Sequence, residues 1–170
     1  MSLVVEDGSG KTDADSYLSV ADADTYHTNH SGSTDWSGAD TAVKEKALRL
    51  ATQYLDVRYN GLWKGYRSNV GQALDWPRAY VDDSDGFYYD SDEMPPRIKD
   101  ATAELALKVI EGDTLLADIK KPGAIKRKRV KAAVVETETE YVGGYNQVKK
   151  YPLIDGLIRP LIEVGVLERG

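Results

Sequence analysis

Residue types that could carry chemistry are few and scattered in this sequence. His27 and His30 lie three residues apart, a spacing that can place two imidazoles on one face of a helix as metal ligands. Apart from common aspartates, no third ligand is spaced near them, so a metal site is not favoured. The sequence has no cysteine, which removes thiolate nucleophiles, disulfides and cysteine-based zinc sites. We expect no catalytic, cofactor-binding or metal-binding residues.

Two segments resemble ligand-binding loops in part. Gly10-Lys11-Thr12 is similar to the end of a phosphate-binding loop, but Val5 stands where that loop needs its first glycine. In the acidic segment 82–93, placing Gly86 at the sixth position of a calcium loop puts Val81 at the first, where a carboxylate is required. The sequence therefore predicts a plain turn and a solvated loop. A hydrolase working through the acidic loop is a third alternative.

The densest charge in the chain lies between residues 120 and 141. A basic run is followed by a segment in which glutamates alternate with Val, Thr and Tyr, and this period of two predicts a strand. We interpret the two parts as an extended arm or hairpin that pairs with a partner. Phosphate contact through the basic run is the alternative. The partner-binding residues expected in the arm are Lys126, Arg127, Lys128, Arg129, Lys131, Val135, Thr137 and Tyr141.

Length and composition limit the class of protein. A chain of 170 residues is long enough for one domain with its own core, and 41% hydrophobic and 29% charged residues are typical of a soluble globular protein. The net charge of −6 argues against a surface that binds nucleic acid everywhere, while a local basic patch remains possible. No apolar run approaches the ~18 residues that a membrane-spanning helix needs.

The elements that must position these residues begin with a helix predicted at residues 41–60. Its apolar stripe comprises Val43, Ala47, Leu50, Tyr54 and Val57, widened by Leu48, Ala51 and Leu55. Lys44 is expected on the wet side of this helix. Trp63 and Trp76, in the polar segment that follows, are interpreted as buried side chains that hold this loop against the helix. The residues expected to organise the core are Tyr54, Leu55, Trp63 and Trp76.

Further helices are predicted at residues 19–29, with Ser19 as N-cap, and at 95–111, with Pro95-Pro96 in the first turn. Residues 29–38 are expected to form a loop in which Trp36 is the candidate for burial. The chain closes on an apolar segment, 151–170, which follows the predicted hinge Gly143-Gly144 and docks on its own core or on a neighbour. The partner contacts expected there are Leu157, Ile158 and Leu161.

The predicted fold class is mainly α. We expect a small bundle of three to four helices, an extended β arm or hairpin and a short C-terminal helix. The predicted organisation is one domain with an appendage: a helical core at residues 1–118, a basic and acidic arm at 119–150, and a C-terminal docking helix at 151–170.

Seven short segments, in order along the chain, carry a resemblance to a known family. They are VEDG (5–8), ADSYLS (14–19), ADADTY (21–26), YLD (54–56), QALDWPR (72–78), PPRIKDAT (95–102) and YPLID (151–155). The set resembles the head–tail connector (adaptor, or head-completion) proteins of tailed bacteriophages. Such sequences are sometimes labelled as resembling a primosomal single-stranded-DNA-binding protein.

The resemblance implies a structural protein of the virion neck, made in the cytoplasm of a bacterial host. Its expected partners are further copies of the same chain in a ring of twelve, the portal protein and tail or stopper proteins. Genome DNA passes through the ring without sequence-specific binding, and no membrane is involved. The family has no catalytic residues to carry over. Neither the basic run nor the acidic loop matches a motif of the family.

Two functional hypotheses from different classes follow. The leading hypothesis is the connector ring, which extends the DNA channel below the portal and docks the tail. The alternative is a single-stranded-DNA-binding module, which needs a basic groove with exposed stacking aromatics. Because the tyrosines of the sequence cluster with aspartates, the residue pattern favours the connector.

Overall fold

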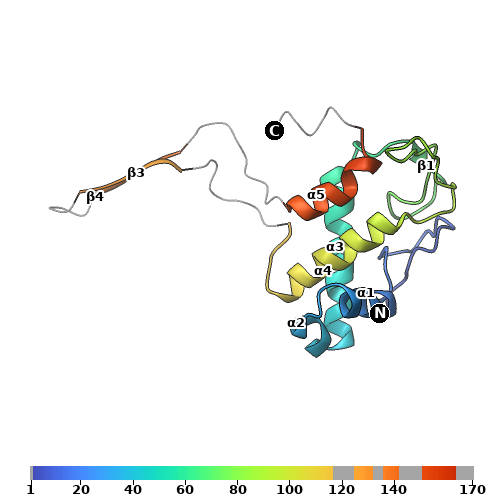
Figure 1. The fold of residues 1–170 in the computed structure, drawn as a ribbon, viewed down its shortest axis with the longest axis horizontal. Coiled ribbons are helices and arrows are strands. Elements are labelled where there is room, and N and C mark those ends of the chain that lie inside the picture. The colour runs from blue at the N-terminus through green and yellow to red at the C-terminus, as the bar shows by residue number, and fades with distance from the viewer. Residues whose placement is uncertain (1, 117–124, 132–135, 142–150, 164–170) are drawn as a thin grey trace.

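The computed structural model describes residues 2–116, 125–131, 136–141 and 151–163 (Figure 1). The described part is mainly helical, with a two-stranded antiparallel hairpin and a short C-terminal helix, as the sequence predicted. In chain order the elements are α1 (Val20–Asn29), α2 (Thr34–Gly38), α3 (Thr41–Tyr59), β1 (Tyr66–Arg67), β2 (Arg78–Ala79), α4 (Pro96–Ile110), β3 (Ile125–Lys131), β4 (Glu136–Tyr141), α5 (Pro152–Ile158) and the 3-10 turn η1 (Arg159–Leu161).

Helix α3 is the centre of the bundle, and α4 crosses and packs against it (Figure 1). The buried face of α3 is rotated from the predicted stripe: Val43 and Val57 are 47% and 60% exposed, whereas Leu48 and Leu55 are fully buried. The helix therefore buries the side that carries its small residues and leucines, where α4 can approach closely with its own alanines. The buried residues of α3 are Lys44, Ala47, Leu48, Ala51, Thr52, Tyr54, Leu55 and Tyr59.

Helices α1 and α2 pack on one end of the bundle (Figure 1). The hydroxyl of Ser19 accepts from the backbone N–H of Asp22 and caps α1 as predicted, because it satisfies an otherwise free donor. The region predicted as a loop, 29–38, contains the short helix α2, which Ser33 caps. Trp36 lies in that helix and is buried, so the sequence found the burial but missed the turn of helix.

The segment between α3 and α4 folds back over the bundle as predicted. Trp63 and Trp76 are buried, with their ring centroids 5.9 Å apart in an edge-to-face arrangement. Strands β1 and β2 pair antiparallel, with Tyr66 opposite Ala79 and Arg67 opposite Arg78. The segment between α3 and α4, called the loop layer below, thus combines a short antiparallel strand pair with two buried tryptophans.

The C-terminal helix α5 belongs to the chain's own core. Ile158 and Leu161, which the sequence assigned to partner binding, are fully buried, and Leu157 is half-buried against the same core. The backbone N–H of Lys64 donates to Leu161 (3.0 Å), which ties this segment to the loop after α3. Of the two predicted alternatives for this segment, the structure shows docking on the chain's own core: α5 covers α4, so its apolar side chains have partners within the subunit.

Strands β3 and β4 form a ribbon that projects away from the helices (Figure 1). Val135 and the proposed hinge Gly143-Gly144 lie outside the described residues. None of the described helices is long and apolar enough to cross a membrane.

Candidate functional site

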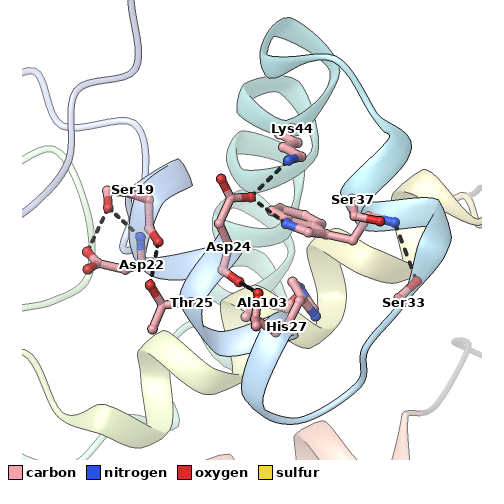
Figure 2. Close-up of polar contacts among 12 residues, drawn as sticks. Ser19, Asp22, Asp24, Thr25, His27, Ser33, Ser37, Lys44 and Ala103 are labelled. Atoms are coloured by element: carbon pink, nitrogen blue, oxygen red, sulfur yellow. Dashed lines mark hydrogen bonds and ion pairs between the residues drawn. The ribbon is translucent and has the colours of Figure 1, made fainter.

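A partly buried polar cluster joins the first four helices (Figure 2). One carboxylate oxygen of Asp24 accepts from the indole N–H of Trp36 (2.7 Å) and from the ammonium of Lys44 (2.9 Å). Burial opposes ionisation of Asp24, but these two hydrogen bonds outweigh it and lower the pKa of the carboxyl. Lys44 is only 9% exposed, which corrects the prediction that it lies on the wet side of its helix. The ion pair with Asp24 and the face of Trp36 compensate the buried charge.

The two histidines do not converge. His27 is buried, with Nε2 3.2 Å from the carbonyl oxygen of Ala103 (Figure 2). Its Nδ1 lies 3.1 Å from the hydroxyl oxygen of Ser31. Burial lowers the pKa of His27. The ring of His30 stacks on Tyr26 instead. No group of three or more His, Asp or Glu side chains within the described ranges is arranged to hold a metal ion.

The loop that resembles a phosphate-binding loop already holds an anion, the carboxylate of Glu6. That carboxylate is 2% exposed and accepts from the backbone N–H groups of Gly8, Gly10 and Lys11 at 2.9, 2.9 and 2.8 Å. Converging N–H groups form a typical anion-binding nest. Because a side chain of the same loop fills the nest, the arrangement is structural, as the predicted turn implies.

The acidic segment 82–93 also uses its carboxylates locally. One oxygen of Asp83 accepts from the backbone N–H groups of Asp85 and Phe87, at 2.8 and 2.9 Å. Asp82 pairs with Lys64 at 3.0 Å. These contacts shape a tight turn, and they leave the aromatic rings of Phe87 and Tyr88 exposed.

A second buried network connects α3 to the loop layer. The hydroxyl of Tyr17 donates to Asp56, and the backbone N–H of Trp76 donates to the Tyr17 oxygen at 3.2 Å. Burial raises the pKa of Asp56 to about 7, with the nearby charge of Asp75 adding to the shift. A carboxyl with such a pKa could serve in acid–base chemistry. Its described hydrogen-bond partners are the buried phenol of Tyr17 and the backbone N–H of Asp75, which join α3 to the segment before β2.

The charged strands β3 and β4 pair in a register that sorts their residues by face. Arg127, Arg129 and Lys131 stand opposite Glu140, Glu138 and Glu136. Lys128 stands opposite Thr139, Val130 opposite Thr137 and Ile125 opposite Tyr141. Lys126 lies at the irregularity between Ile125 and Arg127, opposite no residue of β4. Since directly opposed residues share a face, one face has balanced charge and the other carries Lys128 and Tyr141 without a carboxylate.

One exposed surface was missed at the sequence level. Tyr66 and Tyr80 are 74% and 76% exposed, and their ring centroids lie 6.5 Å apart. The signal that could have found it is Gly65 directly before Tyr66, a glycine that allows backbone to approach closely in a tyrosine-rich loop.

A comparison with family models matches residues 1–169 of the chain to the family described as "Putative DnaT-like ssDNA binding protein". The chain belongs to this family. No curated protein and no solved structure matches it. Membership in the DnaT-like family agrees with the label noted with the sequence resemblance, and it corresponds to the alternative hypothesis better than to the connector.

Two surfaces described above could bind a ligand of this DnaT-like chain. One is the face of the β3–β4 ribbon with Lys128 and Tyr141, and the other is the exposed pair Tyr66 and Tyr80. Its buried polar clusters are closed networks in which each described acid or base already has a partner.

Proposed function

We propose that this DnaT-like protein binds single-stranded DNA, and that strand β3 makes its contacts with the phosphate backbone. The observation that carries the proposal is the charge distribution. Five of the seven residues of β3 are basic, and β4 has three acidic residues, so the ribbon has a net charge of +2. Because the whole chain has −6, the remaining residues together carry −8. The ribbon is therefore the part of the molecule to which a polyanion is attracted.

The register narrows the contact to one face of the ribbon. Cations that stand opposite carboxylates are partly neutralised, whereas Lys126 and Lys128 have no carboxylate opposite them. Tyr141 lies on the same face as Lys128 and could stack with a base. We infer that this face, rather than the arginine face, meets the phosphates.

Fluorescence anisotropy with a labelled oligo-dT strand, titrated at several salt concentrations, tests this proposal. The logarithm of the binding constant should fall linearly with the logarithm of the salt concentration, by ~0.7 per phosphate contact. Changing Lys126 and Lys128 to glutamine should reduce that slope by about 1.4, as expected for two lost contacts. The matched control, Arg127→Gln with Arg129→Gln, removes the same charge from two positions that stand opposite glutamates and should reduce the slope less. Absence of binding at low salt would overturn the proposal.

A second candidate function, the head–tail connector ring, is favoured by a different observation. An isolated two-stranded ribbon is at best marginally stable in water, yet this one projects from the helices (Figure 1). A neighbouring copy could supply the missing surface, and contacts of this head-to-tail kind close into rings. The colinear sequence resemblance adds support. We propose that such a ring would contact portal and tail proteins in the neck of a phage virion.

Negative-stain microscopy of the purified protein distinguishes the two candidates. Closed rings together with weak, salt-insensitive DNA binding would favour the connector. Monomers or small oligomers that bind oligo-dT with a steep salt slope would favour the DNA-binding module.

A further inference from the structure

Tyr66 and Tyr80 are exposed, whereas several other tyrosines of the chain have a structural role in the core. Tyr17, Tyr54 and Tyr59 are at most 2% exposed, and the hydroxyls of Tyr17 and Tyr59 donate to the half-buried carboxyls of Asp56 and Asp155. The rings of Tyr66 and Tyr80 lie instead in solvent, edge to face with each other. Two large aromatic rings side by side on a surface are a typical feature of a recognition site.

The backbone holds this pair in place at a cost. Tyr80 has φ of 61°, a left-handed conformation that is uncommon for a residue with a bulky side chain. Gly65 also has positive φ, and a Cβ there would lie 2.1 Å from the carbonyl oxygen of Ala79. Strained conformations of this kind persist only where the surroundings enforce them, and they cluster at functional sites.

The enforcing contact is a set of hydrogen bonds from the half-buried side chain of Arg78. The guanidinium of Arg78 donates to the carbonyl oxygens of Lys64 (2.8 Å), Gly65 (2.8 Å) and Asp75 (3.2 Å). These bonds fix β2, just before Tyr80, to the backbone just before Tyr66. The relative position of the two rings is therefore set by a rigid support rather than by contact between the rings alone.

The charge around the pair suits a phosphate backbone. Arg67 follows Tyr66 on β1 and is exposed, and within the described ranges no carboxylate pairs with it. Between residues 62 and 80 the chain has three basic residues and one acidic residue. The nearest acidic neighbour in sequence beyond Tyr80, Asp82, is paired with Lys64.

The other exposed aromatic pair has the opposite surroundings. Phe87 and Tyr88 are 74% and 73% exposed, as open to solvent as the tyrosine pair. They lie in a segment with six carboxylates between residues 82 and 93, which repel phosphate. Exposure alone thus does not select a base-binding surface, whereas exposure beside an unpaired arginine does.

We propose that Tyr66 and Tyr80 form a stacking surface for the bases of single-stranded nucleic acid, with Arg67 contacting the adjacent phosphate. The inference rests on the proposed DNA-binding function and adds a second contact region to it. Base–aromatic stacking tolerates any sequence, because every base has a π face. The ribbon would then supply the salt-dependent part of the affinity, and the tyrosine pair a part that depends little on salt.

Anisotropy titrations of the full chain with labelled oligo-dT test this division. Changing Tyr66 and Tyr80 to alanine should weaken binding by roughly tenfold or more and leave the salt slope unchanged. The double phenylalanine variant keeps both rings and should bind like the parent. Because both side chains are exposed, the thermal melting of all variants should match the parent, which excludes unfolding as the cause.

The matched control is Phe87→Ala with Tyr88→Ala, which should leave affinity unchanged. Equal loss in the control and the tyrosine variant, or no loss in either, would overturn the inference while the salt slope of the ribbon variants still upholds DNA binding. If the parent fails to bind at all, the proposed function and this inference both fail. Loss of self-association with unchanged DNA binding would identify the tyrosine pair as a protein interface and overturn the inference.

Discussion

The helical bundle and the β3–β4 ribbon are stabilised in different ways. In the bundle, apolar side chains from α3, α4 and α5 share one core, and the partly exposed carboxyls of Asp24 and Asp56 have specific hydrogen-bond partners. For the ribbon, the contacts that the structure describes are its backbone pairing and its cross-strand register. The difference indicates that the bundle keeps the protein folded, while the ribbon is free to carry function. Four predictions test this difference.

The largest effect is expected from removing the C-terminal helix. Deleting residues 143–170 removes Ile154, Ile158, Leu161 and Ile162, all at most 3% exposed. At ~1.5–3 kcal/mol each, their burial is comparable with the whole stability of a domain. We expect the truncated chain to be unfolded by circular dichroism. Replacing residues 125–141 with a Gly/Ser linker should leave melting nearly unchanged, and a large loss of stability there would contradict the comparison.

Truncating the loop-layer tryptophan should be the next largest effect. Trp76 is fully buried against Trp63, so Trp76→Ala should cost roughly 3–5 kcal/mol through lost contacts and a cavity. Urea denaturation measures the difference directly. Tyr88→Ala, at an exposed site, should change stability by less than about 0.5 kcal/mol. A Trp76→Ala variant as stable as the parent would show that the loop layer is not part of the core.

The buried carboxyl of Asp56 should make the bundle sensitive to pH. Its pKa rises from 3.8 to about 7 on folding, so the folded state holds a proton that the unfolded chain releases above about pH 4. The stability that this group contributes is complete below that pH and is lost as pH rises through about 7. Since Asp56 is not fully buried, we expect a loss on the order of 2 kcal/mol. Asp56→Asn should flatten this part of the stability profile, and the exposed Asp85→Asn should leave it unchanged.

The smallest effect should come from the ribbon itself. Arg129 stands opposite Glu138, and such a cross-strand pair contributes ~0.2–1 kcal/mol. Arg129→Glu should speed hydrogen exchange of the ribbon amides without shifting the melting of the bundle. Adding Glu138→Arg restores an opposed pair and should slow exchange again. No recovery in the double variant would show that the register does not govern the ribbon.

Much of the bundle could be predicted because periodicity and capping are local. The bounds of α1, α3 and α4, the Ser19 cap and the burial of Trp76 all follow from patterns within a few turns. The face of α3 was predicted incorrectly at its ends, since Val43 and Val57 are apolar but are left exposed by the described elements. Which side is buried depends on the neighbouring helix, and that information is not local.

The surface that covers the apolar C-terminal segment could not be predicted for a related reason. A sequence pattern shows that Ile158 and Leu161 must be buried, but it does not show whether the covering surface lies in the same chain. The polar contacts were harder to predict from the sequence than the apolar ones. Burial of Lys44 requires Asp24 and Trp36 to meet from other helices, and the exposed pair of Tyr66 and Tyr80 requires a clamp by Arg78. Contacts between distant residues decide each of these.

The nest around Glu6 gives this protein an internal ligand. Three backbone N–H groups converge on a site that the chain fills with its own carboxylate. A Glu6→Ala variant would keep the convergent N–H donors and lose the carboxylate that accepts from them. Its folding should then be open to chemical rescue, in which formate or phosphate from the buffer takes the empty place and restores stability in proportion to RT ln(1 + [L]/Kd). The side chain of Glu6 therefore decides whether the turn is stabilised from within the chain or depends on an anion bound from solution.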